Sequence, residues 1–496
     1  MMTLGQIGNL GKELTRFLAL FVGCFRSQPG LALVRIYVQG LLSDLGRKNA
    51  EAIALEFDTP PRTLQRLLES IKWDEQAVRD TCQQLVAHDH RHAEAIGCID
   101  ESGTAKSGDQ TVGVARQWLG SCGKVDNGVV GVHLSYRAPG FQCLLDSEIY
   151  LPEEWAQDKE RRKKNYVPDG VVFRTKPQIA LDLVDRALAN GVRVQAWTFD
   201  ELYGRDSAFL DGLEQRGQVF VGEVPTNFRG WLKKPRVLRR GKKSLGRGRK
   251  KQYPRLAAGQ PSREVQNLLR YSPVFQEQRW QRYRIKDTTR GPEVWEVKWA
   301  VFWRKGSGGL PSRRQCLIVA RNVLTGEVKY FVSNRVPGER GLTLRRLLRI
   351  AFGRWSVESC FREAKEELGL DHYEVRGWRC VHRHFHLTQL SHLFCARVRQ
   401  KYDAQIVRVD PQEQLTMEQV RRAVNAWLRA TAPRLSKTKR LEKELAKQHY
   451  YQKRAAQAQR SHTKTRKARL KALGIDPDRI KSCLTPQPVG DESCTL

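Results

Sequence analysis

Apolar residues recur at helical spacing through the first part of the chain. The spacing predicts five helices, over residues 14–25, 31–43, 47–57, 61–70 and 74–87. Pro60 and Pro61 separate the third helix from the fourth, and Thr59 is expected to cap the fourth. Residues 1–92 are therefore expected to form an all-helical N-terminal domain.

The segment 47–70 resembles a helix-turn-helix. Its second helix would offer four side chains to a nucleic-acid groove: Arg62, Thr63, Gln65 and Arg66. The first 90 residues carry equal numbers of basic and acidic side chains, which argues against strong DNA affinity of this segment alone. A helical dimerisation or packing module is the alternative interpretation.

From residue 95 the apolar period changes to that of strands. Strands are predicted over residues 95–99, 112–119, 129–136 and 142–150, then a helix over 177–190, a strand over 193–199, a helix over 207–215 and a strand over 218–223. Successive strands followed by helix, strand, helix and strand indicate a mixed α/β sheet, in the order of ribonuclease H-like folds. Asp100 would close the first of these strands and Asp200 the strand 193–199, and the two strands would be neighbours.

Further strands are predicted over residues 293–304, 315–321 and 328–333. Asp200 and Glu358 are roughly 160 residues apart, too far for a simple connection, so a domain must be inserted between them. The expected fold class is α/β: a ribonuclease H-like mixed-sheet catalytic core interrupted by a β-rich insertion domain, with a helical N-terminal domain and a basic helical tail. The expected domains are 1–92, 93–224 (core), 225–340 (insertion), 341–430 (core, with the catalytic helix) and 431–496 (tail, with a disordered end).

The positive charge of the chain indicates the class of partner that it binds. The 87 Lys and Arg against 53 Asp and Glu give a net charge of +34. Most of the excess lies in three runs, residues 159–164, 233–251 and 434–471, and clustered charge of this kind fits a polyanion such as DNA. A solvated face or a mobile tail is the alternative for any single run. The same charge makes a neutral glycan an unsuitable substrate for a glycosidase that used the two aspartates.

Three carboxylates stand out within this basic chain. Asp100 and Asp200 follow apolar runs, and Glu358 lies between Arg354 and Lys365 on a predicted helix, with Arg362 close by. Two Mg²⁺ ions held by three carboxylates can cut phosphodiesters, with Asp100 bridging both ions and the other two carboxylates holding one each. Turn or cap aspartates and a surface ion pair are the alternative readings. The neighbouring acids are possible substitutes: Glu101, Glu201, Glu363 and Glu366.

The segments around these carboxylates resemble a known family. Asp100-Glu101-Ser102-Gly103 with Lys106, then Gly113-Val114-Ala115-Arg116-Gln117-Trp118, Gly120, Gly123 and Lys124, resemble the first block of bacterial insertion-sequence transposases of the DDE superfamily. Phe199 to Gly204 is similar to the second aspartate motif of that family. Arg354, Glu358 and Lys365 fit the spacing of its third signature. That signature also has a tyrosine, and this sequence has Ala351 at the tyrosine position.

The resemblance implies a ribonuclease H-like fold and two Mg²⁺ or Mn²⁺ ions per active site, held by Asp100, Asp200 and Glu358. It implies cut-and-paste transposition by a homodimer or larger oligomer, on double-stranded DNA with terminal inverted repeats and on target DNA. The expected location is the bacterial cytoplasm, with the nucleoid. Phosphate or DNA contacts are expected from Arg354, Lys365, Arg362, Lys106, Arg116, Lys242, Lys243, Arg247 and Arg249. A nuclease without strand transfer and a domesticated DNA-binding protein or repressor are the alternatives.

Tryptophans alternate along the predicted strand 293–304. Trp295, Trp299 and Trp303 would lie on one face of a sheet, where core packing is the favoured interpretation. Stacking of one of them on a flipped base is the functional alternative, for which Trp231 and Trp280 are weaker candidates.

Other chemistries are not favoured. His382, His384, His386, His392 and Cys395 lie close in sequence but lack a familiar zinc spacing. Gly241-Lys242-Lys243-Ser244 lacks the rest of a phosphate loop, so no nucleotide cofactor is expected. The eleven scattered cysteines indicate a reducing compartment, and the apolar run 17–25 is too short to span a membrane.

Overall fold

The computed structural model describes residues 2–120, 122–239, 254–288, 291–306, 308–405, 415–432 and 436–474. The chain separates into two compact units, Met1–Ala430 and Thr431–Leu496. The predicted disordered end, from Pro477 onward, lies outside the described residues, as does most of the basic run 233–251. The predicted domain boundaries within the first unit stay predictions.

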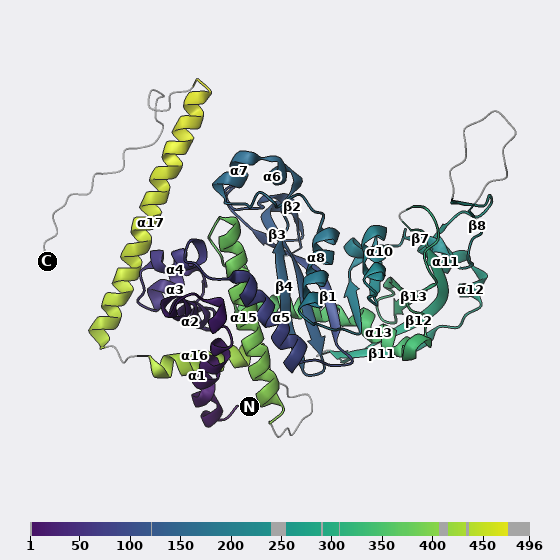
Figure 1. Cartoon of the computed structure of the whole chain (residues 1–496), viewed down its shortest axis with the longest axis horizontal. Helices are drawn as coiled ribbons and strands as arrows, with labels where there is room; N and C mark the ends of the chain where they lie inside the picture. Colours follow the sequence, from purple (N-terminus) through teal and green to yellow (C-terminus); the bar gives the residue numbers. More distant parts are fainter. Residues whose placement is uncertain are drawn as a thin grey trace. The chain divides into compact units, whose positions relative to one another are not determined.

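The N-terminal part of the first unit contains five α-helices, each overlapping a predicted one (Figure 1). They are α1 (Leu4–Ala19), α2 (Gln28–Leu42), α3 (Ala50–Glu56), α4 (Pro61–Glu69) and α5 (Glu75–Asp89), with a short 3₁₀ helix η1 (Val22–Cys24). α1 begins ten residues earlier than predicted because Thr3 and Gln6 form a capping box. The prediction that Thr59 caps α4 is wrong: its hydroxyl donates to the Phe57 carbonyl, and Pro60 precedes the helix without a side-chain cap.

The first sheet contains β1 (Ile96–Ala105), β2 (Ala115–Leu119), β3 (Lys124–Ala138), β4 (Phe141–Ile149) and β5 (Ala196–Phe199). β3 is central: β1 pairs with it antiparallel along one edge, and β2 and β4 pair antiparallel with its two halves. β5 adds to β1 in parallel. The prediction that Asp100 closes the first strand is wrong, because pairing with β3 continues from Asp100, opposite His133, to Ala105, opposite Gly128.

Helices cover this sheet and connect it with the N-terminal helices. α8 (Lys176–Ala189) packs against β3 and β4, with α10 (Ser207–Gln215) beside it. α15 (Trp378–Asp403) packs against β4 and also against α2, α4 and α5, as Figure 1 shows. Short helices α6 (Glu153–Gln157), α7 (Lys159–Lys164) and α9 (Glu201–Gly204) follow β4 and β5.

A second sheet of seven strands follows. Its order is β10 (Arg263–Glu264), β7 (Arg229–Trp231), β12 (Gly291–Arg304), β13 (Gln315–Asn322), β14 (Val328–Ser333) and β6 (Val221–Val224), and β11 (Gln281–Thr288) also pairs with β12. β11 was not predicted from sequence. A parallel bridge between Trp197 and Phe220 joins β5 to the residue before β6, so the two sheets adjoin. Shorter elements in this part are β8 (Val237–Leu238), β9 (Arg255–Leu256), α11 (Val265–Tyr271) and α12 (Pro273–Gln276).

The chain then returns to the first sheet through helices. After the short η2 (Glu339–Gly341) come α13 (Leu344–Gly353), α14 (Trp355–Arg362) and a π-helical turn, η3 (Glu363–Glu367), and then α15 and α16 (Met417–Thr431). In the second unit, Ser436 caps α17 (Lys437–Ala472), a helix rich in exposed Lys and Arg. Among the described residues, no helix combines the length and apolar character needed to cross a lipid bilayer.

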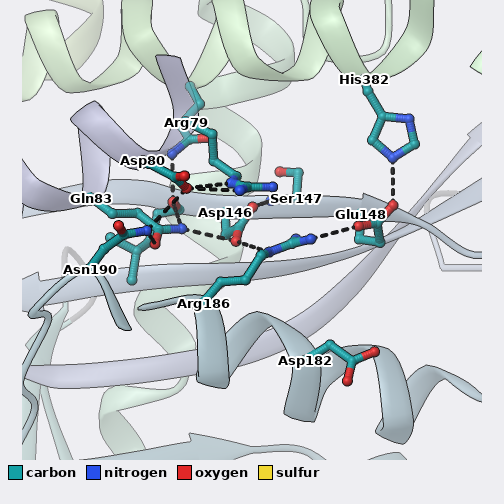
Figure 2. Close-up of polar contacts among 12 residues, drawn as sticks. Arg79, Asp80, Gln83, Asp146, Ser147, Glu148, Asp182, Arg186, Asn190 and His382 are labelled. Atoms are coloured by element: carbon teal, nitrogen blue, oxygen red, sulfur yellow. Dashed lines mark hydrogen bonds and ion pairs between the residues drawn. The ribbon is translucent and has the colours of Figure 1, made fainter. Parts of the chain in front are cut away.

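Buried charged groups connect β4 with the helices around it (Figure 2). Arg186 of α8 donates to Asp146 at 3.0 Å and to Glu148 at 2.9 Å, and both carboxylates are buried. The ring of His382 from α15 lies 2.5 Å from the second oxygen of Glu148. Gln83 of α5 donates to Asp146 at 2.9 Å. A buried charge is tolerated only when it is paired, so these contacts fix α5, α8 and α15 against β4.

Substitution of Arg186 by Met should lower the free energy of unfolding by about 3 kcal/mol, because two buried carboxylates lose their cation. Urea unfolding followed by circular dichroism measures this difference. Arg216→Met is the matched control, since Arg216 pairs with Asp185 at the surface and its loss should cost under about 1 kcal/mol. Equal losses in the two variants would contradict the structural role given to Arg186.

The stability of the protein should also depend on Glu148 in acid. Burial by itself would raise the pKa of Glu148, but His382 and Arg186 outweigh it and hold this pKa well below its usual range. The stabilisation is therefore complete above the unfolded-state pKa of about 4.3 and is lost as the pH falls below it. The difference in unfolding free energy between wild type and Glu148→Gln should shrink between about pH 4 and pH 2, and a constant difference would contradict this assignment.

Candidate active site

Asp100 and Asp200 come together at the edge between β1 and β5. Asp100 lies within β1, and its carboxylate accepts from the Glu101 backbone N–H at 2.9 Å. Asp200 directly follows β5 and caps α9, accepting from the Leu202 N–H at 3.0 Å. Because the two strands are parallel and paired from Ile96 to Ile99, the end of β5 lies beside the middle of β1, where Asp100 follows Ile99. Burial raises the pKa of Asp100, and the charge of Asp200 raises it further.

Arg354 links these carboxylates to others. The residue stands between α13 and α14, and its Nη1 lies 3.3 Å from Asp100 Oδ2. Nη2 lies 3.7 Å from Glu358 Oε1, and Nε lies 3.8 Å from Glu223 Oε2. Although burial alone would lower the pKa of Arg354, the surrounding carboxylates, Asp200 among them, raise it. One guanidinium therefore contacts or faces all three carboxylates singled out in the sequence.

Glu358 reaches this group only through Arg354. It lies in the first turn of α14, and its side chain is 65 % exposed, whereas that of Asp100 is 15 % exposed. The spacing of four residues between Arg354 and Glu358 gives the contact that an α-helix predicts. The carboxylate of Glu358 thus faces solvent at the open side of the site.

Two further acids belong to the site. Glu223, within β6, contacts Arg354 and also accepts from Lys329 at 2.7 Å. Glu101, which the sequence offered as a possible substitute, accepts from Lys176 of α8 at 3.1 Å, and its charge raises the pKa of Asp200 after burial itself. The strand that carries Glu223 was predicted from the sequence, but Glu223 itself was not singled out, because its partner Arg354 lies far along the chain.

Two lysines border the carboxylates. Lys365 donates from Nζ to the Gly103 carbonyl of β1 at 3.1 Å. It lies in the π-helical turn η3, so the α-helical face that the sequence predicted for it with Arg354 and Glu358 does not continue to this residue. Lys106, just after β1, donates to the Tyr373 carbonyl at 2.7 Å, and burial lowers its pKa to about 8.

Two of the other predicted DNA contacts lie on the surface. Arg362 is exposed at the end of α14, and Arg116 is exposed on β2. Lys242, Lys243, Arg247 and Arg249 lie outside the described residues. Their role in binding phosphates stays a prediction.

Tryptophans of β12 differ in burial. Trp295 is 1 % exposed and packs with its ring 4.9 Å from that of Phe352 and 6.2 Å from that of Trp355. The stacking role suggested for Trp295 is therefore corrected: it is a core residue under α13 and α14. Trp299 and Trp303 are half-buried, and their role in stacking stays a prediction.

The histidines of α15 have separate partners. His382 bonds to Glu148, His384 lies 2.8 Å from the Tyr37 hydroxyl and 2.9 Å from the Gly369 carbonyl, and His392 lies near the Leu144 N–H. Burial lowers the pKa of His384 to about 4 and that of His392 to about 3. These rings serve as buried hydrogen-bonding groups in the helix that covers β4.

Comparison with known proteins is consistent with this geometry. The family model described as DDE superfamily endonuclease matches residues 21–292, more than half of the chain. The chain belongs to the DDE superfamily of endonucleases.

The chain is similar to one curated protein, the "Probable transposase for insertion sequence element IS701" of Microchaete diplosiphon. The two are 29 % identical over 191 residues, which are 38 % of this chain and 47 % of the relative. The chain thus spans about half the length of that protein. Among solved structures, the piggyBac transposase synaptic complex with hairpin DNA matches with a TM-score of 0.37 and 10 % identity, over 88 % of this chain and 84 % of that chain.

The oxygen ligands that the candidate site offers suit a hard divalent cation. Asp100, Asp200 and Glu358 offer only carboxylate oxygens, the ligands that Mg²⁺ prefers. The raised pKa values of Asp100 and Asp200 indicate negative charge that a bound cation would relieve. Across the described part of the chain, no three His, Cys, Asp or Glu residues are grouped closely enough to hold a metal ion as they stand. Loading the site would thus require the side chain of Glu358 to turn toward the two aspartates.

Replacement of Asp200 by Asn should raise the free energy of unfolding by about 1 kcal/mol in metal-free buffer at pH 7. The reason is that the substitution removes the carboxylate charge that Glu101 repels. The Asn oxygen can still accept from the Leu202 N–H. Asp200→Ala is the matched control, since it removes the same charge and also the cap, and it should be about 1 kcal/mol less stable than Asp200→Asn. Thermal unfolding in chelator measures both variants. An Asp200→Asn variant less stable than wild type would contradict the repulsion.

Proposed function

We propose that this protein is a DNA transposase, which cuts the ends of its element and joins them to target DNA. The observation that carries the proposal is the placement of Asp100, Asp200 and Glu358 around the single guanidinium of Arg354 in a chain of the DDE superfamily. The name of the curated relative supports transposition over other uses of such a site.

The order of the first sheet supports a ribonuclease H-like core. Going across the sheet, β4, β3, β1 and β5 are neighbours, and Phe220 before β6 follows β5 in parallel. β3 alone is antiparallel to both β1 and β4, and β1 and β5 are parallel. In this arrangement the end of β5 adjoins β1 at Asp100, and the return of the chain through α14 adds the third carboxylate.

Each residue of the site has a role that follows from its charge and position. Arg354 is buried and held by carboxylates on three sides, so its guanidinium would lie against the phosphate that approaches them. Lys365 and Lys106 are anchored to backbone carbonyls and keep positive charge beside β1. These cations would orient the strand for in-line attack on phosphorus, first by water and then by a 3′-hydroxyl.

Asp100, Asp200 and Glu358 would hold two Mg²⁺ or Mn²⁺ ions. The chemistry supplied by such ions is activation of the attacking oxygen and stabilisation of the leaving oxygen. Glu223 and Glu101, which contact Arg354 and Lys176, would keep those cations in place when phosphate arrives.

The basic surfaces supply the affinity for DNA. α7 carries five of its six residues as Lys or Arg, and α17 presents basic residues along its whole length. Double-stranded DNA carrying the terminal inverted repeats of the element is the proposed partner, together with target DNA. A homodimer or larger oligomer would hold the two ends together. The helix-turn-helix reading of α3 and α4 is retained for end recognition, with exposed Arg62 and Arg66 on α4.

Two alternatives share parts of this evidence. A ribonuclease H-like nuclease would cut DNA but fail to join a pre-cut end to a second duplex. A domesticated repressor would bind the element's ends and leave them uncut in the presence of Mg²⁺ or Mn²⁺.

Asp100→Asn, Asp200→Asn and Glu358→Gln should each lower nicking of the element's end by about a thousandfold or more, with DNA affinity kept, because each removes a charge needed in the transition state. Gel assays with labelled end DNA in Mn²⁺ and in chelator measure the effect. Glu418→Gln is the matched control, an exposed acid of α16 that should leave nicking unchanged. Full activity in any of the three variants would remove that residue from the site.

A further inference from the structure

The hairpin formed by β2 and β3 has two different faces. Along β2, Ala115, Gln117 and Leu119 are partly or fully buried, whereas Arg116 and Trp118 between them are exposed. Trp118 pairs in register with Val125 of β3, so the two side chains share the outer face. Trp118 is 60 % and Val125 is 51 % exposed. The hairpin thus presents an apolar pair to solvent.

This exposure is unusual within the protein. The chain has twelve tryptophans, all within the described ranges, and Trp118 is the one that is exposed. Burial of a tryptophan side chain is strongly favourable, so an exposed one beside charged residues indicates a surface that another molecule covers.

The hairpin lies against the strand that carries Asp100. Leu119, on the inner face, packs on Gly103, where a Cβ added to the glycine would lie 2.7 Å from Leu119 Cδ2. The carbonyl of the same glycine accepts from Lys365. Only two residues separate Gly103 from Asp100 along β1. The inner face of the hairpin is therefore fixed next to the carboxylate site, and its outer face is left open.

Positive charge lies on the outer face and beside it. Arg116 neighbours Trp118 on the same face. The basic helix α7 is attached to the loop that leads into β2, because Arg161 donates to the Asp109 carbonyl at 3.1 Å and Lys164 donates to Gln110 at 2.5 Å. A polyanion with flat apolar groups fits such a surface, and a nucleic acid has both.

We propose that the outer face of the β2–β3 hairpin binds the DNA that enters the active site. Trp118 packs on a base or sugar next to the cut, and Arg116 contacts a flanking phosphate. The occupant is the strand being cut rather than a distant duplex, because the hairpin shares Gly103 with Lys365 at the carboxylate site. The proposal rests on the proposed function and adds a contact that determines how the strand is held.

Binding of the full-length protein to a labelled duplex of about 40 base pairs, measured by fluorescence anisotropy over a series of salt concentrations, tests the contact. Trp118→Ala should weaken binding about tenfold with the salt slope unchanged, because stacking releases no counterions. Trp118→Phe should bind within about threefold of wild type, since it keeps a flat ring. Arg116→Gln should lower the salt slope by roughly 1.

Tyr271→Ala is the matched control, because Tyr271 is a comparably exposed aromatic on α11. It should bind as wild type does. Affinity of Trp118→Ala equal to that of this control would overturn the proposal. Wild-type protein that neither binds nor cuts DNA would instead overturn the proposed function, so the two failures are distinct.

A second measurement does not depend on how well Trp118→Ala folds. Cys122 is exposed in the turn of the hairpin, and an azidophenacyl group attached to it can be cross-linked by light to end-labelled duplex from the element's terminus. Cross-links that Cys122→Ser loses should map within a few nucleotides of the nicked phosphate. Cross-links only at distant positions, or none beyond the Cys122→Ser background, would overturn the proposal.

Discussion

Pairing of buried charge is the constraint on which this structure depends. Arg186 is held by Asp146 and Glu148 of β4, with His382 of α15 on the far oxygen of Glu148. Arg383 of α15 is 2 % exposed and donates to the carbonyls of Leu67, Ile71 and Trp73. Since an unpaired charge in the interior costs several kcal/mol, these contacts have little freedom to exchange. They determine how the N-terminal helices, α15 and the first sheet fit together.

The same physics shapes the candidate site, where the pairing is incomplete. Four carboxylates stand close to one guanidinium, and burial and mutual repulsion raise the pKa of Asp100 and of Asp200. Groups so placed lower the stability of the isolated protein, and they favour any additional cation. A second buried cation, Lys48, lies just beyond the site: it donates to the Leu41 carbonyl and to that of Glu367 at the end of η3. The loop between α2 and α3, which carries Lys48, thereby supports the turn that follows α14.

Aromatic side chains show how far the local pattern can mislead. The alternation of Trp295, Trp299 and Trp303 correctly indicated one face of a strand, but α13 and α14 cover Trp295, and a helix that arrives about 50 residues later cannot be read from that strand. Trp118 lies in an equally strand-like segment and stays exposed, because none of the described residues covers the outer face of its hairpin. Burial is decided by the neighbours of an element and not by its own period.

The sequence by itself determined the local elements and the chemistry available to them. The period of 3.6 predicted α2 to α5 and α10, the period of 2 predicted β3, β4 and β14, and the acids after apolar runs marked Asp100 and Asp200. Only the tertiary structure decided that β1 continues past Asp100, that Glu223 joins Arg354, and that Lys365 lies in a π-helical turn. Each of these depends on contacts between residues far apart in the chain, whose free energy does not appear in any short window of sequence.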